Sequence, residues 1–538
     1  NIGVREPVYP LSEGISNARM SDLVGQALAR APELPEWIEP SVLGQQGWSG
    51  WRDALLAVHG HPDGHGAQRR LAYDEIFAGQ LALMLVRADA RRRRAVPIRP
   101  DGRLRDQVKL PFAPTGAQRR SIAEIDGDCV QSAPMLRLLQ GDVGSGKTWV
   151  ALMALLGAVE SGMQGAFLAP TEILARQHYA TLQKMLAGVP VNIAILTGRD
   201  KGRVRESTLM GLADGSIDIL VGTHAIFQEA VSYKRLGLAV VDEQHRFGVG
   251  QRETLVQGAR IDGLVPHLVS MTATPIPRTL ALTLYSDLHH VLLREKPAGR
   301  LPIETHVTRG AGREQAYRAI RDAVARKERV YVVFPLIEAS DTTGSAALMD
   351  AYKELSKGPL EGLGIGIVHG KQKAKEQEDA FAEFKSGKKP VLLSTTVIEV
   401  GVDVPEATII MIENAERFGL AQLHQLRGRV GRALLPSKCF LATDVEGDKL
   451  LRLQLMERIQ DGFALAEEDL KIRGSGRILG TIQSGRDLGF RYIQLTDIPL
   501  MKKANEDVKA FLQKDGGIEA HPSIATAVHR LQESTHFE

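Results

Sequence analysis

The segment GDVGSGKT, at residues 141–148, constrains the fold of this chain more than any other feature. It fits the pattern G-x-x-x-x-G-K-[ST], in which glycines let backbone N–H groups face phosphate oxygens. The apolar run MLRLLQ precedes the segment, and the long apolar run WVALMALLGAVES follows it. Strand, glycine-rich loop and helix in this order are the context that the pattern requires. The segment therefore predicts an α/β domain with a phosphate-binding loop.

Short apolar runs alternate with helical stretches in two successive series. In the first series the expected strands are 135–140, 165–170, 217–223, 238–243 and 268–274. In the second series they are 329–337, 364–370, 390–397, 408–415 and 439–443. This rhythm is typical of parallel sheets with helical crossovers. We therefore expect two α/β domains in tandem, of which only the first has a phosphate loop.

The two ends of the chain differ from this pattern and are expected to be mainly helical. Residues 1–105 have no strand rhythm, although apolar residues recur there at helical spacing. The basic run Arg91–Arg94 is either a solvated helix end or a contact for DNA phosphates, and the prolines and glycine of 97–102 then predict a linker. The sequence thus suggests four segments: 1–105, 106–300, 301–445 and 446–538.

Composition restricts the class of protein only weakly. The chain has 67 Lys and Arg against 64 Asp and Glu, so a nucleic-acid partner would need local basic patches. Cys129 and Cys439 have no metal-ligand spacing and are expected to be buried thiols in a reducing cytoplasm. No apolar run reaches the length of about 20 residues that a membrane span needs, and no signal-peptide pattern opens the chain.

The phosphate loop suggests how ATP would be bound. The residues expected to surround its phosphates are Gly141, Gly144, Ser145, Gly146, Lys147 and Thr148. Lys147 would neutralise charge on the β- and γ-phosphates, and Thr148 would place a hydroxyl on Mg²⁺. Gln118 precedes the loop, where its amide could read an adenine edge or be an ordinary surface side chain.

Two acidic residues follow an apolar strand of the first series. Parallel strands deliver residues at their carboxyl ends to the ligand edge of the sheet. Asp242 is therefore expected to hold Mg²⁺, usually through water. Glu243 is expected to orient and deprotonate the attacking water.

The segment QLHQLRGRVGR, at residues 422–432, supplies arginines from the second domain. Arg429 and Arg432 lie three residues apart, so this spacing predicts that they share one helix face. They are either a solvated basic face or a pair of arginine fingers that stabilise transition-state charge. The neighbouring Gln425, Gly428 and Gly431 favour the second interpretation.

Two further segments are candidates for coupling nucleotide state to movement. SMTATP ends a strand with three hydroxyls, which reflect either β-propensity and capping or a coupling element whose Thr272 would sense Glu243 and His245. STTVIEVGVDVP has the matching position in the second domain and would place Asp403 near the nucleotide.

In its ordered set of motifs the chain resembles superfamily 2 helicases of the DExH type. The motifs are GSGKT, APTEILARQH, GTHA, VVDEQHRFGV, MTATPIPRTLAL, STTVIEVGVDVP and RFGLAQLHQLRGRVGR. Over residues 8–500 the chain is most similar to the RecG family of bacterial DNA translocases, which VYPLSEG and LPFAPTGAQ distinguish from the transcription-repair coupling factor. The resemblance implies two RecA-like domains that close around ATP and Mg²⁺. It implies an ATP-dependent double-stranded DNA translocase for fork reversal and branch migration in recombination and repair.

The same resemblance suggests residues that would contact DNA or couple closure to movement. GFALAEEDLKIRGSGRILGTIQSG, at 462–485, is similar to the translocation motif that these two families share. The candidates in this motif and in APTEILARQH and GTHA are Thr171, Arg176, Thr223, Arg473 and Gln483. Helix capping and surface charge are the alternative roles for the three residues of the first domain.

The chain also departs from the family pattern. Ser475 and Arg477 stand where a Pro and a Glu are usual, Ile482 stands where an Arg is usual, and HGKQK replaces the more usual HGRM. These changes bear on the tuning of translocation and not on ATP hydrolysis. The family carries an N-terminal wedge with an OB fold, and this chain starts where that domain normally ends. We therefore expect the wedge to be missing. Without the wedge, the sequence does not determine which DNA structure the chain prefers.

Three other functions would share part of this motif pattern. A transcription-repair coupling translocase would share the motor motifs but carry an RNA-polymerase-binding domain. An RNA helicase is disfavoured by the segment 462–485, and a non-catalytic DNA-binding remnant would have lost Lys147, Glu243 or Arg432. The resemblance implies a monomer in the bacterial cytoplasm, associated with the nucleoid. Its expected partner is branched or double-stranded DNA, and single-stranded DNA-binding protein is a candidate partner.

Overall fold

The computed structural model describes residues 9, 14–60, 65–109, 113–228, 230–243, 263–273, 289–295, 301–335, 341–395, 404–431, 435–473, 492, 498–513, 518 and 521–534. The chain divides into two compact units. One unit joins helices from both ends of the chain, and the other contains two large parallel sheets. Among the helices of these described ranges, none combines the length and the apolar character that crossing a membrane requires.

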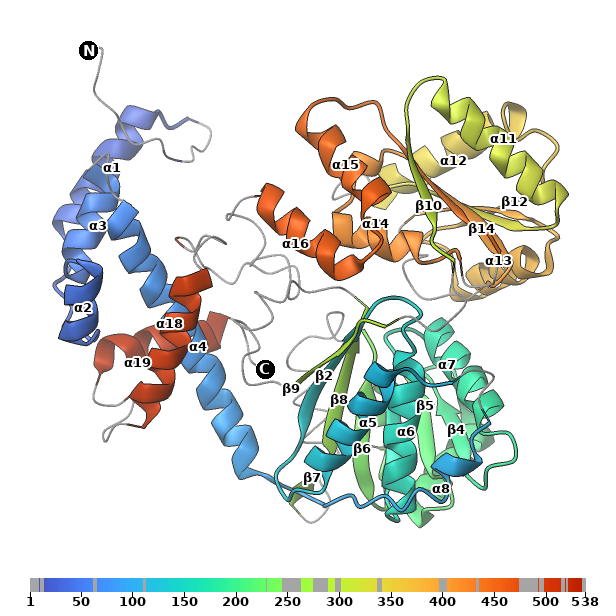
Figure 1. The fold of residues 1–538 in the computed structure, drawn as a ribbon, viewed down its shortest axis with the longest axis horizontal. Helices are drawn as coiled ribbons and strands as arrows, with labels where there is room; N and C mark the ends of the chain where they lie inside the picture. The colour runs from blue at the N-terminus through green and yellow to red at the C-terminus, as the bar shows by residue number, and fades with distance from the viewer. Residues whose placement is uncertain are drawn as a thin grey trace. The chain divides into compact units, whose positions relative to one another are not determined.

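The first large sheet has seven parallel strands (Figure 1). Their order across the sheet is β4 (Ile193–Leu196), β5 (Ile219–Gly222), β3 (Gln164–Leu168), β6 (Leu236–Val241), β8 (His267–Thr272), β2 (Leu136–Gly141) and β9 (His289–Leu293). The five strands expected from the sequence are present. The two strands that were not expected, β4 and β9, are the edges of the sheet. In β4 three of four residues are only half-buried, as suits an edge strand, although its sequence IAIL is apolar throughout.

Helices cover both faces of this sheet. One face packs on α5 (Gly116–Cys129), α6 (Lys147–Glu160) and α7 (Glu172–Met185), and the other on α8 (Gly202–Asp214) and the 3₁₀ turn η2 (His224–Phe227). Alternate residues of β6 divide between the two faces: Leu238 and Val240 pack with α6, whereas Ala239 and Val241 pack with α8. Because both faces are covered, the central strands are apolar throughout.

The second sheet has six parallel strands. Their order is β10 (Glu304–Thr308), β15 (Lys438–Ala442), β14 (Ala407–Ile412), β11 (Arg329–Val333), β13 (Val391–Ser394) and β12 (Ile365–Val368). All five expected strands are present, and the additional strand β10 forms an edge. Its sequence ETHVT is polar and only partly buried, so hydrophobic patterning alone did not predict it.

Helices again cover both faces of the second sheet. One face packs on α11 (Gly312–Ala325) and α12 (Asp341–Lys357), and the other on α13 (Ala374–Ser386), α14 (Leu420–Arg427) and α15 (Asp448–Arg458). Helix α16 (Gly462–Arg473) follows and contributes the buried Leu465 to the second of these clusters. Two tandem RecA-like domains are thereby confirmed. Cys129 and Cys439 are both buried and free, as expected.

The segment that the sequence predicted to be a linker is fastened to the first sheet domain. Before this segment the two-residue strand β1 (Arg94–Ala95) pairs with β7 (Leu264–Val265), and after it comes the 3₁₀ turn η1 (Arg105–Gln107). The Glu160 carboxylate accepts hydrogen bonds from the backbone N–H groups of Leu104 at 2.7 Å and Arg105 at 3.0 Å. The Arg105 guanidinium pairs with Asp126 at 2.6 Å. Bonds of this kind hold the connection in one conformation.

The helical unit combines the first and last segments of the chain. Its helices are α1 (Asn17–Ala29), α2 (Pro40–Gln46), α3 (Trp51–Gly60), α4 (His65–Arg92), α18 (Ile498–Leu512) and α19 (Pro522–Ser534). The Tyr73 hydroxyl on α4 donates to Asp507 on α18 at 2.5 Å, and the rings of Phe77 and Phe511 meet edge to face. This grouping differs from the segment boundaries suggested by the sequence, because α15 belongs instead with the second sheet.

Candidate active site

The phosphate loop lies between the end of β2 at Gly141 and the start of α6 at Lys147. Gly144 has φ 78° and Gly146 has φ 85°, in the left-handed region that favours glycine. A Cβ atom at Gly146 would lie 2.2 Å from Nε2 of Gln118. Backbone conformation and space therefore both require glycine at this position, and the loop has the backbone that its sequence pattern predicts.

Gln118 fastens the phosphate loop to the start of α5. Its side chain is fully buried, and its Oε1 accepts the backbone N–H of Thr115 at 2.9 Å. Nε2 donates to the Ser145 carbonyl at 2.9 Å. Gln118 is therefore not an ordinary surface glutamine, and its expected contact with an adenine edge stays a prediction.

Lys147 and Ser145 equip the loop to bind an anion. The Lys147 ammonium donates to the carbonyls of Gly141 at 2.6 Å and Asp142 at 3.1 Å. Burial lowers the pKa of Lys147, while the nearby Glu243 and Asp242 act in the opposite direction. Within the described part of the chain, the buried Ser145 hydroxyl has no hydrogen-bond partner. A partly buried ammonium and an unsatisfied hydroxyl fit the phosphate oxygens of a nucleotide.

Asp242 immediately follows β6, at the carboxyl edge of the sheet. Its Oδ2 lies 2.8 Å from Nε2 of His178, and its Oδ1 accepts the backbone N–H of Glu243 at 3.0 Å. Burial acts to raise the pKa of Asp242, but the His178 hydrogen bond and the charges of His178 and Lys147 outweigh it, so the pKa is lowered. An ionised carboxylate and the Thr148 hydroxyl are hard oxygen donors that suit Mg²⁺.

Glu243 has an unusual backbone conformation. Its φ is 50°, a value that few residues other than glycine adopt. Such conformations occur mostly at functional sites, where the surrounding structure maintains them. The end of β6 therefore bends sharply at the residue expected to act on water.

Strand register brings Thr272 to the same edge of the sheet. On β8, Thr272 is paired with Gln140 of β2, and Ser270 with Val241 of β6. The buried Thr272 thus lies at the carboxyl ends of the two strands that carry the phosphate loop and Asp242. His245, which it was expected to sense, lies outside the described residues.

Arg429 does not lie on a helix, contrary to what its three-residue spacing from Arg432 predicted. Helix α14 ends at Arg427, and Gly431 has φ 71°, which α-helical geometry does not allow. Arg429 lies in the turn that follows the helix and is only 6% exposed. Its positive charge acts to lower the pKa of Lys147, and its neighbour Gly428 lies against the phosphate loop, since a Cβ atom at Gly428 would be 3.0 Å from the Cβ of Val143. Arg432 and Asp403 lie outside the described residues.

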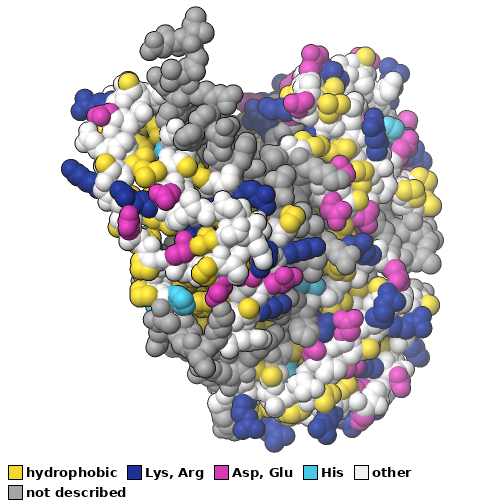
Figure 2. Space-filling model, turned by 60° about the vertical axis from the view of Figure 1, so that its left-hand side comes forward, with side chains coloured by type: hydrophobic (Ala, Val, Ile, Leu, Met, Phe, Trp, Pro, Cys, Tyr) yellow, Lys and Arg dark blue, Asp and Glu magenta, His cyan; other side chains and the backbone are white. Residues whose placement is uncertain are grey.

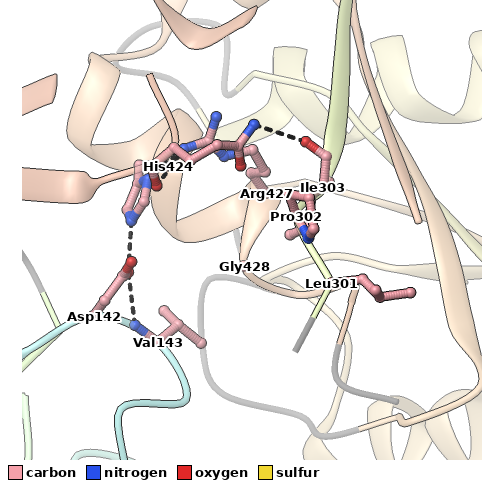
Figure 3. Close-up of a pocket in the computed structure, with 9 residues that line it drawn as sticks. Asp142, Val143, Leu301, Pro302, Ile303, His424, Arg427 and Gly428 are labelled. Carbon is pink, nitrogen blue, oxygen red and sulfur yellow. Dashed lines mark hydrogen bonds and ion pairs between the residues drawn. The ribbon is translucent and has the colours of Figure 1, made fainter. Parts of the chain in front are cut away.

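A second contact between the sheet domains involves residues that sequence reasoning missed. Nε2 of His424 lies 2.5 Å from Oδ1 of Asp142, as Figure 3 shows. Nδ1 of His424 lies 2.9 Å from the Arg427 guanidinium, which donates to the Met456 carbonyl at 2.7 Å. Asp142, His424 and Arg427 line a cavity of about 240 Å³, together with Val143, Leu301, Pro302, Ile303, Gly428 and Gln460.

The candidate DNA and coupling residues have different environments. The Thr171 hydroxyl accepts the Leu174 N–H at 3.4 Å and so caps α7, which was its alternative role. Arg176 is exposed on α7, and Thr223 is buried before η2. Arg473 is the last residue of α16, whereas Gln483 lies outside the described residues.

The first parallel-sheet domain carries a phosphate loop, and the charge of Arg429 in the second parallel-sheet domain acts on Lys147 of that loop. This arrangement defines a helicase motor. The family model for DEAD/DEAH box helicases matches residues 115–283, and that for the helicase conserved C-terminal domain matches 315–434. The ATP-dependent DNA helicase RecG of Escherichia coli K12 is 42% identical over 496 residues, covering 89% of this chain and 71% of that relative. The chain belongs to the RecG family of ATP-dependent DNA helicases.

Other relatives agree with this assignment. RecG of Synechocystis is 42% identical, covering 96% of this chain and 63% of the relative, and RecG of Thermotoga maritima is 40% identical, covering 94% and 65%. A solved structure of RecG bound to a three-way DNA junction has 37% identity and a TM-score of 0.77, covering 93% of this chain and 66% of that one. The chain thus spans about two thirds of the length of these relatives. The resemblance inferred from the motifs is confirmed.

Proposed function

We propose that this chain is an ATP-dependent double-stranded DNA translocase that acts on branched DNA in recombination and repair. The observation that carries the proposal is the assembly of Lys147, Asp242 and Glu243 at one sheet edge, with the charge of Arg429 close to Lys147. The family uses ATP, and its relative in the solved structure is bound to a three-way DNA junction.

In this proposal the chain's own side chains divide the work of hydrolysis. Lys147 and the loop N–H groups bind the phosphates, and Gln118 and Asp403 contact the rest of the nucleotide. Thr148 and Asp242 would hold Mg²⁺, which supplies charge neutralisation at the phosphates when it is bound. Glu243 orients the attacking water and accepts its proton. Arg429 and Arg432 stabilise the charge that develops on the transferred phosphoryl group.

DNA would be held mainly through its phosphates, since a motor must move over any sequence. Figure 2 shows Lys and Arg side chains interspersed with Asp and Glu on the face in view, without one continuous basic patch. Support for a DNA grip therefore comes from the motifs that carry Thr171, Arg176 and Thr223, with Thr272 and His245 as sensors. Cycles of closure around ATP would move the duplex past these contacts.

The working form is proposed to be a monomer at the bacterial nucleoid, with single-stranded DNA-binding protein as a candidate partner. The bacterial origin of the relatives supports this setting. Sedimentation of the purified chain with and without that protein tests both statements. A stable dimer of the chain, or two species that never co-sediment, would contradict the corresponding statement.

ATPase rates with different nucleic acids test the proposed function most directly. Forked DNA and linear duplex should stimulate hydrolysis more than single-stranded DNA or RNA, because a duplex translocase hydrolyses ATP as it moves along a duplex. Stimulation should weaken as salt rises, since phosphate contacts release counterions. Stronger stimulation by RNA than by any duplex would instead indicate an RNA helicase.

Arg473→Ala should separate ATP hydrolysis from movement. Arg473 ends α16 in the middle of the proposed translocation motif, residues 462–485, away from the phosphate loop in sequence. The variant should retain substantial DNA-stimulated ATPase activity and lose branch migration, measured on a synthetic four-way junction. Arg458→Ala, an exposed arginine that ends α15, is the matched control and should leave both activities unchanged. Equal loss of both activities in Arg473→Ala would assign Arg473 to the nucleotide site or to folding.

A further inference from the structure

We propose that His178 is a positioning residue that fixes the orientation of the Asp242 carboxylate for Mg²⁺, an inference that rests on the proposed ATPase function. Nε2 of His178 lies 2.8 Å from Oδ2 of Asp242. The side chains are 12% and 11% exposed, so the hydrogen bond is largely shielded from water. His178 lies on α7, whereas the phosphate loop precedes α6 and Asp242 follows β6.

Both oxygens of the carboxylate are held by separate donors. His178 engages Oδ2, and the Glu243 backbone N–H engages Oδ1 at 3.0 Å. Two donors on opposite oxygens define the plane of the carboxylate and leave the remaining lone pairs in fixed directions. Partners of this kind orient metal ligands, and their loss typically weakens metal affinity by about 10- to 100-fold.

The His178 ring is itself held in place. It packs against Phe167 of β3, with ring centroids 4.6 Å apart. Phe167 is the strand neighbour of Val240 on β6, the strand that leads to Asp242. The imidazole and the carboxylate are therefore positioned by adjacent strands of one sheet.

The start of α7 is anchored as well. Arg199 pairs with Glu172, the first residue of α7, and with Glu378 on α13 of the second sheet domain, each at 2.6 Å. This bridge restrains the helix from which His178 reaches Asp242. The orientation of the Asp242 carboxylate therefore depends on the position of α7 on the sheet, and not only on β6, the strand that precedes Asp242.

Two substitutions distinguish positioning from packing. His178→Phe keeps a ring against Phe167 but removes the N–H donor. His178→Gln loses the ring but keeps an amide N–H that can reach Asp242. Gln183→Ala, an exposed position on the same helix, is the matched control. A positioning role predicts that Mg²⁺-dependent nucleotide binding is weakened in His178→Phe and close to wild type in His178→Gln. A packing role predicts the reverse.

The measurement is binding of a fluorescent, non-hydrolysable ATP analogue as Mg²⁺ is titrated, together with binding in excess EDTA. The Mg²⁺ concentration at half-maximal binding should rise about tenfold in His178→Phe, stay near wild type in His178→Gln, and not change in Gln183→Ala. Binding in EDTA should be equal in all four proteins, because the phosphate loop is intact.

An unchanged Mg²⁺ midpoint in His178→Phe would overturn the proposal, and so would an equal loss of binding in EDTA, which would indicate a general structural role. Failure of the proposed function would be recognised separately. In that case the wild-type chain itself would hydrolyse no ATP in the presence of Mg²⁺ and duplex DNA.

Discussion

Glu243→Gln is expected to abolish ATP hydrolysis while leaving ATP binding intact. The amide has nearly the same shape as the carboxylate, so the sharp bend at φ 50° and the hydrogen bond from the Glu243 N–H to Asp242 should persist. It cannot accept the proton of the attacking water, however. Losing a general base typically lowers the rate by about 10²- to 10⁴-fold. Because the proton moves only in the transition state, affinity for ATP should hardly change.

Two measurements on the same protein check this prediction. Steady-state ATPase assays with duplex DNA give kcat, and a non-hydrolysable analogue gives Kd. Lys147→Ala is the comparison variant, since removing the partly buried ammonium should weaken binding as well as turnover. If Glu243→Gln retained activity within about tenfold of wild type, its assignment as the residue that deprotonates water would be wrong.

Arg429→Ala is expected to lower kcat by about 10³-fold or more, the range in which arginine fingers act. Arg429 is buried in the turn after α14 of the second sheet domain, and its charge acts on Lys147 of the first sheet domain. A cation so placed can stabilise charge on the transferred phosphoryl group at little cost in reorganisation. Binding of ATP should weaken much less than turnover falls, because this charge develops in the transition state.

Arg318→Ala provides the control, since Arg318 is exposed on α11 of the same domain. It should keep wild-type kcat and the wild-type unfolding temperature. The Arg429 variant should also unfold at the wild-type temperature, which separates catalysis from folding. A kcat close to that of wild type, or a loss of stability that accounts for the lost activity, would contradict the finger assignment.

Most of the architecture was predictable because it depends on local patterns. The phosphate loop is a short glycine pattern between a strand and a helix, and a single stretch of sequence determines that conformation. Central strands such as β6 and β14 are continuous apolar runs, because both faces of each sheet are covered. The edge strand β10 escaped prediction because its partly exposed sequence ETHVT has no continuous apolar run.

The end of α14 shows the limit of spacing arguments. Residues three apart share a face only while the helix continues. The sequence suggested a helix through both arginines, but α14 ends at Arg427 and Arg429 occupies the following turn. The candidate role of Arg429 is unaffected, since it depends on proximity to Lys147 and not on a helix face.

The sequence by itself determined the two RecA-like domains, the phosphate loop, the acids at the end of β6 and the family. Only the tertiary structure paired His178 with Asp242, His424 with Asp142, and Tyr73 with Asp507. The physical reason is that hydrophobic periodicity and glycine patterns encode the conformation of neighbouring residues. A hydrogen bond between distant elements depends instead on how the folded chain brings their side chains together, and no local pattern records that.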